Sequence, residues 1–164
     1  MDVPVDLDAR IVPNQGLGGF WLRTRVMDLQ HALEPMGPLY RRGRLYMPDP
    51  LEARYELNQG EVTLAVDVRV GKVFRIDARR GYRGALDPGI QVGMKVREVL
   101  RLDPRYRYEE CGALLMAEDV LGVSLGLEDS DPDPGEVPDL RVRVISVYAV
   151  EAFGAVGSLV PEDW

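Results

Sequence analysis

The sequence GLGGFWLRTRVMDLQHAL, residues 16–33, has a counterpart 70 positions further on, PGIQVGMKVREVLRLDP, residues 88–104. Both follow one pattern: glycine, apolar, any residue, apolar, any two residues, basic, valine, any residue, acidic, apolar. Internal repeats decide the architecture of a chain and are sought first. The spacing predicts a single domain over residues 1–164 with two tandem copies, the first over about 16–80 and the second over about 88–153.

Each copy is expected to begin with a short helix. Apolar residues follow each glycine at helical spacing and form one face of a helix. The two faces consist of Leu22, Val26, Leu29 and Leu33, and of Val92, Val96, Val99 and Leu100.

Segments of alternating apolar and polar residues follow both helices. They span residues 39–47 and 53–80 in the first copy, and 105–118, 120–129 and 140–153 in the second. Turns are expected at 58–60 and 70–72, and the four residues Leu64, Val66, Val68 and Val70 should form one apolar strand face. An antiparallel sheet with one face covered by helices satisfies this pattern. We therefore predict an α+β fold of two tandem repeats, each a short helix followed by antiparallel strands.

The phrase GIQVGMKVREV, residues 89–99, resembles helix openings in small bacterial proteins. Together with the tandem helix–sheet layout it is similar to the secreted β-lactamase inhibitor proteins and to immunity proteins that neutralise bacterial toxins. In such proteins a small hydroxyl residue often follows the Gly-Met pair, where this chain has Lys95, and the first copy has Arg23 and Thr24 in place of Gly-Met. The resemblance implies binding to another protein through a sheet face or its loops.

Composition narrows the classes of partner. The 164 residues carry a net charge of −7 and one cysteine, Cys111. An acidic chain repels phosphate backbones, and the basic stretches at 40–46 and 78–84 are expected to be turns and strand edges, so we expect no nucleic-acid partner. We expect no membrane partner either, since no apolar run approaches the roughly 20 residues that span a bilayer. The acidic start of the chain does not resemble a signal peptide, and a single cysteine fits a cytoplasmic location.

The sequence offers no catalytic constellation. The one histidine, His31, has no serine or cysteine motif near it in the sequence, and one histidine with one cysteine does not make a zinc site of the usual kind. Asp129, Asp131 and Asp133 have the 1, 3, 5 spacing of a calcium loop, but proline and leucine stand where that loop needs glycine and glutamate. We therefore expect no catalytic residues, no metal and no cofactor.

An acidic loop is the strongest candidate for a binding site. Five carboxylates crowd into nine residues, and three prolines keep the stretch out of a sheet: Glu128, Asp129, Asp131, Asp133 and Glu136, with Pro132, Pro134 and Pro138. Such a loop attracts basic partners. Trp21, Tyr82 and Tyr148 are candidate aromatic anchors beside it.

Three functions fit these observations. The favoured one is a non-catalytic protein-binding module, including the case of an immunity protein that inhibits a basic toxin domain. The alternatives are a small-ligand binder or enzyme with a site between sheet and helices, and a structural module that associates through a sheet edge. The sequence leaves the oligomeric state open.

Overall fold

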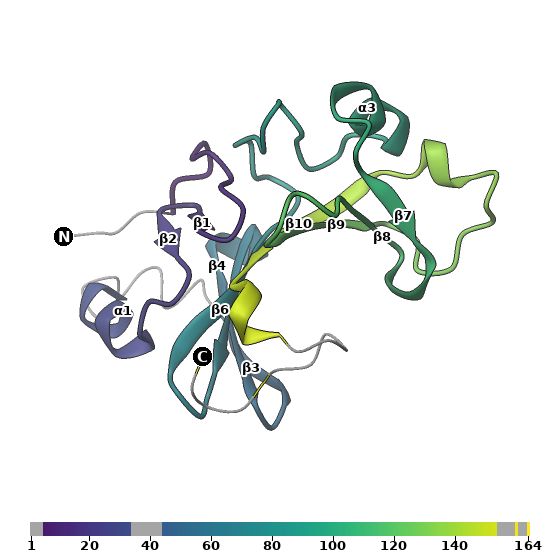
Figure 1. The fold of residues 1–164 in the computed structure, drawn as a ribbon. Helices are drawn as coiled ribbons and strands as arrows, with labels where there is room; N and C mark the ends of the chain where they lie inside the picture. Colours follow the sequence, from purple (N-terminus) through teal and green to yellow (C-terminus); the bar gives the residue numbers. More distant parts are fainter. Residues whose placement is uncertain (1–4, 34–43, 154–159, 161–163) are drawn as a thin grey trace.

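The α+β prediction is confirmed by a computed structural model, which describes residues 5–33, 44–153, 160 and 164. Two α-helices, α1 (Val26–Leu33) and α3 (Val96–Leu102), accompany a large antiparallel sheet in the described part of the chain (Figure 1). The strands are β3 (Arg44–Asp49), β4 (Glu52–Leu57), β5 (Val62–Asp67), β6 (Lys72–Ala78), β7 (Arg107–Glu109), β8 (Leu114–Met116), β9 (Val123–Leu127) and β10 (Val142–Tyr148). A small ribbon of β1 (Gly16–Leu17) and β2 (Phe20–Trp21) precedes α1. Short 3-10 turns are η2 (Asn58–Gly60), η3 (Glu110–Gly112), η4 (Val137–Asp139) and η5 (Val150–Ala152).

The strands form one continuous sheet in the order β3-β4-β5-β6-β10-β9-β8-β7. Strands from the two halves of the sequence meet at its centre, where β6 pairs antiparallel with β10 and Asp77 lies opposite Ser146. Each half therefore contributes consecutive hairpins on its own side of this central pair, and β3 and β7 are the edges.

Two equivalent sets of backbone hydrogen bonds dock the turns before the helices onto the central strands. The first set is Arg23 N to Val73 O (2.7 Å), Val73 N to Thr24 O (2.9 Å) and Val26 N to Gly71 O (2.8 Å). The second is Gly93 N to Val142 O (2.8 Å), Val142 N to Met94 O (2.8 Å) and Val96 N to Leu140 O (2.9 Å). The helices start 70 residues apart, at Val26 and Val96, within the two repeated phrases. The predicted helix faces are wrong at their first residues, because Leu22 and Val92 lie in the turns that precede the helices. The duplication of a whole unit stays a prediction.

One apolar core extends along the sheet and under the helices. Its fully buried members include Ile76 on β6, Leu115 on β8 and Ile145 on β10, and α3 contributes Val96 and Val99. Burying such side chains is the main favourable contribution to folding. The core therefore joins both halves of the chain.

The prediction that Leu64, Val66, Val68 and Val70 form one apolar strand face is wrong for Val68 and Val70, which lie beyond the end of β5. Strand β5 ends at Asp67, and Val68 lies in the following turn with 42% of its surface exposed. All six residues of β5 are buried, and the strand carries a register shift between Ala65 and Val66. Because both faces of β5 are covered, its burial does not follow the period of two that marks a half-exposed strand.

Candidate protein-binding groove

The acidic loop, residues 128–136, connects the region of β9 to η4 and β10. Figure 1 shows it in yellow-green at one end of the molecule together with α3 and β7, whereas α1 and β2 lie at the other end. All five of its carboxylate residues are exposed, as the sequence predicts for a proline-rich acidic connection. The loop therefore presents its charge to solvent.

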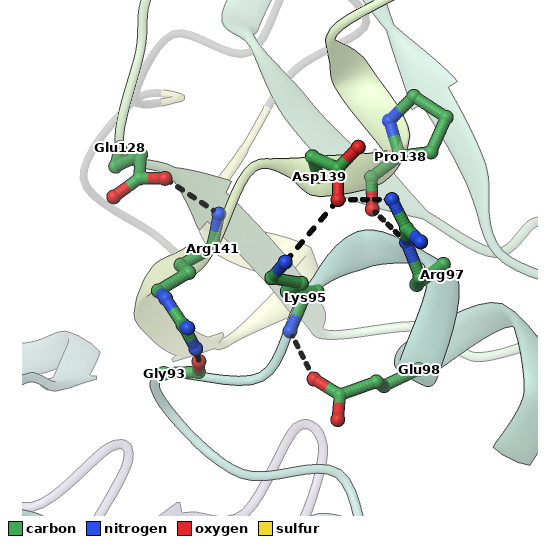
Figure 2. A network of polar contacts seen from close by, with 8 residues as sticks. All are labelled: Gly93, Lys95, Arg97, Glu98, Glu128, Pro138, Asp139 and Arg141. Atoms are coloured by element: carbon green, nitrogen blue, oxygen red, sulfur yellow. Dashed lines mark hydrogen bonds and ion pairs between the residues drawn. The ribbon is translucent and has the colours of Figure 1, made fainter.

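The base of the loop is fixed to the start of α3 (Figure 2). The Arg141 amide donates to Glu128 Oε1 at 2.9 Å, and the Arg141 guanidinium donates to the carbonyl of Gly93 at 2.8 Å. Asp139, at the end of η4, pairs with Lys95 (3.2 Å) and with Arg97. These contacts link the two ends of the loop to one helix and give the rest of it a defined position.

The carboxylates of the loop divide into two kinds. Glu128 accepts from a backbone amide, and Asp129 accepts from the amide of Asp131 at 3.0 Å, so both serve the loop's own conformation. Within the described residues, the carboxylates of Asp131, Asp133 and Glu136 have neither a hydrogen-bond donor nor a cationic partner. These three charges are available to a partner.

Two of the three available carboxylates border a groove with a volume of about 580 Å³. Its lining combines buried apolar side chains, a partly exposed leucine and tyrosine, three acidic residues and the loop prolines: Val96, Leu100, Tyr108, Glu110, Leu115, Asp131, Pro132, Asp133, Pro134, Val137 and Pro138. Leu100, on α3, leaves 38% of its surface exposed. We call this site the acidic groove; it has an apolar floor and a negative rim.

Tyr108 reports the electrostatic character of the acidic groove. Burial raises the pKa of its hydroxyl, and the negative charges of Glu110, Asp131 and Asp129 raise it further. Each carboxylate disfavours a second negative charge nearby. The same field that opposes the phenolate favours a cation.

The three expected aromatic anchors do not lie beside the loop. Trp21 is 57% exposed but lies on β2, at the opposite end of the molecule (Figure 1). Tyr82 is buried; its hydroxyl accepts from Gly18 N at 2.8 Å and donates to Ala9 O at 2.6 Å, which makes it part of the packing of the N-terminal segment. Tyr148 packs edge-on against Phe153 at the far end of β10, six residues or about 20 Å from the strand end that meets the loop.

The aromatic and acidic residues that do accompany the loop are Tyr108 and Glu110, which sequence reasoning missed. They belong to β7 and η3, some 20 residues before the loop, and only the pairing of β7 with β8 brings them to the groove. The one available signal is the alternation in RYRYE, residues 105–109, which places Tyr106 and Tyr108 on the same face.

Other chemistry is sparse in the described part of the chain. No three histidine, cysteine, aspartate or glutamate side chains there are placed to hold a metal ion together. Cys111 is an exposed free thiol, and the side chain of His31 lies outside the described residues, as do residues 40–43 of the first basic stretch. The described helices include none that is long and apolar enough to cross a membrane.

Comparison of the chain with protein-family models, with curated proteins and with solved structures found no significant match. The acidic groove itself is therefore the basis for assigning a function.

Proposed function

We propose that this chain is a non-catalytic protein-binding module whose acidic groove takes a basic segment of another protein. One observation carries the proposal: Asp131, Asp133 and Glu110 border a groove with an apolar floor and have no cationic partner among the described residues. Charge complementarity of this kind selects the partner and accelerates its association.

The groove's mixed lining favours a protein segment over an isolated ion. Exposed apolar surface at Leu100 and Tyr108 gains free energy when another apolar group covers it, and the carboxylates supply specificity for positive charge. The prolines and the contacts at Asp139 and Arg141 hold the groove in place before binding, which reduces the entropy lost on association.

The sequence resemblance makes the proposal more specific. An immunity protein that inhibits a basic toxin domain in the cytoplasm would use such a groove to cover a positively charged surface of the enzyme. The single cysteine supports a reducing compartment.

Binding kinetics test this function. The partner is first captured from native lysate and identified, and association and dissociation rates are then measured for the triple variant Glu110→Gln/Asp131→Asn/Asp133→Asn. The control is Asp28→Asn/Glu118→Gln/Glu136→Gln, which removes the same charge from exposed positions that do not line the groove. Both triples should slow association at low salt, since long-range attraction depends on total charge.

Dissociation distinguishes the two triples. The groove triple alone should dissociate faster, by about tenfold or more, because it loses direct contacts. Equal dissociation rates for the two triple variants would show that the acidic groove is not part of the interface.

A further inference from the structure

We propose that the free edge of β7 accepts an extended strand of the partner, and that a lysine or arginine of this strand, opposite Tyr108, fills the acidic groove. The inference rests on the proposed function and names the segment that the groove binds. It joins two features that lie together in the fold: an unpaired strand edge and a charged pocket beside it.

Strand β7 is the last strand of the sheet and pairs only with β8 in the described structure. Its backbone forms no hydrogen bond to any other described element, and Arg107 and Glu109 are exposed. Such an edge presents alternate N–H and C=O groups to solvent and is a template for another strand. The Arg107 guanidinium donates to the carbonyls of Pro104 and Tyr106, which precede β7.

Successive side chains of a strand point to opposite faces of the sheet, and this alternation places one residue of an added strand over the groove. Tyr108 lines the groove, so its neighbours Arg107 and Glu109 point to the other face of the sheet. In an added strand, the residue opposite Tyr108 lies on the same face, with its Cβ about 4.5–5.5 Å from that of Tyr108. One side chain of the partner is thereby directed to the groove, and its two neighbours are directed away.

A long basic side chain matches what the groove offers. Its aliphatic part can cover Leu100 while its charged end reaches Asp131 and Asp133, as such side chains commonly do at apolar surfaces. The ring of Tyr108 adds an attraction for the cation, and Glu110 closes the negative rim. An apolar side chain would leave the carboxylates desolvated without a partner, and an acidic one would be repelled.

A second copy of this chain fits the site less well. Pairing of two β7 edges would bring two acidic loops toward each other on chains that each carry a net charge of −7, and Tyr108 would face a tyrosine in place of a cation. Like charges across an interface oppose association. Charge complementarity therefore points to a different, basic protein.

Short synthetic peptides test the inference directly. The probe is an acetylated and amidated heptapeptide, Thr-Val-Thr-Lys-Thr-Val-Thr, titrated into the ¹⁵N-labelled full chain and followed by the amide shifts of residues 107–110. Companion peptides carry norleucine or glutamate at the central position. Two more carry N-methyl groups, either on residues 3 and 5 or on residues 2 and 6. In an added strand only one of these two sets of amides faces β7.

We expect the lysine peptide to shift the amides of β7 and the norleucine and glutamate peptides to bind at least about tenfold more weakly. One N-methyl pattern should abolish binding, and the other should leave it within about threefold, since it points away from the edge. The variant Asp131→Asn/Asp133→Asn should bind the lysine peptide more weakly, to the same extent as the wild type binds the norleucine peptide less tightly. Glu118→Gln/Glu136→Gln, with the same charge change outside the groove lining, should leave binding of the lysine peptide unchanged.

Several results would overturn the inference. If the two N-methyl peptides bind equally, no strand is added to β7, although continued dependence on lysine would leave the acidic groove as the binding site of the proposed function. If norleucine binds as well as lysine, the groove does not select a cation. The absence of shifts with every peptide at about 2 mM also overturns it, and so does concentration-dependent dimerisation with shifts at β7 before peptide is added. The proposed function is judged separately, by the dissociation rates of the captured partner.

Discussion

Arg23 and Gly93, 70 residues apart, occupy the same left-handed backbone turn at the entrance to a helix. Their φ angles are 69° and 93°, and each donates its amide to the beginning of a central strand, at Val73 and Val142 respectively. Glycine adopts this conformation without steric cost, whereas a residue with a Cβ does not. Arg23 is held there by its guanidinium, which pairs with Glu151 and donates to the carbonyl of Asn14.

Substitution of Gly93 by alanine should destabilise the chain through the backbone alone. A Cβ at this position meets nothing within 4 Å, so packing is not disturbed, but the left-handed φ costs an alanine about 1–2 kcal/mol. Gly135→Ala is the matched control, because that glycine also has open space around it and no positive φ. Urea unfolding should show a lower free energy of unfolding for Gly93→Ala and a change within about 0.5 kcal/mol for Gly135→Ala. Equal stability of the two variants would mean that the turn at Gly93 does not need a left-handed residue.

Local patterns in the sequence predict where the helices and strands of this fold lie, but they do not predict what packs against each of them. Helical spacing indicates both helices, and alternation indicates the strands of both halves, because each depends on residues close in the chain. The burial of β5 on both faces could not be predicted, since it depends on what packs over the sheet. The density of aspartate and glutamate in residues 128–136 was enough to predict the acidic loop. The groove could not be predicted, because Leu100, Tyr108 and Asp131 come from three elements that only tertiary packing brings together.

A glutamate three residues after the N-cap residue stabilises the start of α3. Lys95, which cannot act as a side-chain acceptor, precedes the helix, yet its backbone amide donates to Glu98 Oε2 at 2.7 Å. Glu98→Ala should therefore lower the free energy of unfolding by about 0.5–1 kcal/mol, and Glu98→Gln should lose less, because an amide oxygen still accepts this bond. Thermal unfolding of the two variants compares them. If glutamine and alanine cost the same, the charge of Glu98 near the helix N-terminus, and not the hydrogen bond, stabilises this end of α3.

Asp103 makes stability depend on pH. Its carboxylate is buried and accepts from the Arg105 guanidinium at 2.9 and 2.7 Å, and this pairing lowers the pKa of Asp103 below its usual value. A carboxylate with a lower pKa in the folded state stabilises the fold above its unfolded pKa of about 3.9, and this contribution disappears as pH falls through the folded value. Asp103→Asn should therefore reduce the free energy of unfolding at pH 7, and its difference from the wild type should shrink as the pH falls below about 4.

The control for Asp103 is Asp119→Asn, which removes the other carboxylate that contacts Arg105, at 2.9 Å, but lies at the surface. An exposed pair of this kind contributes about 0–1 kcal/mol, so its loss should have little effect at either pH. A constant difference between Asp103→Asn and the wild type across the acid range would contradict the assignment of the pH dependence to this carboxylate.

The hydroxyl of Tyr108 measures the field of the acidic groove without any partner. Its pKa should lie above 10, first because of burial and then because of the negative charges around it, with Glu110 the largest of them. Glu110→Gln and Asp131→Asn should each lower this pKa toward 10, since fewer negative charges oppose formation of the phenolate. The titration of the ring carbon resonances, assigned by their loss in Tyr108→Phe, measures the shift. Glu136→Gln is the control, because Glu136 lies on the same loop and is not among the groups that raise the pKa.

High salt distinguishes the two causes that raise the pKa of Tyr108, which are burial and the nearby negative charges. Near 1 M salt, where charges are screened over about 3 Å, the part due to the carboxylates should fall and the part due to burial should remain. The pKa in high salt should then approach that of Glu110→Gln/Asp131→Asn in low salt and still exceed 10. If instead the wild type and this double variant titrate alike at low salt, the carboxylates do not act on the groove, and a cationic side chain would gain nothing from entering it.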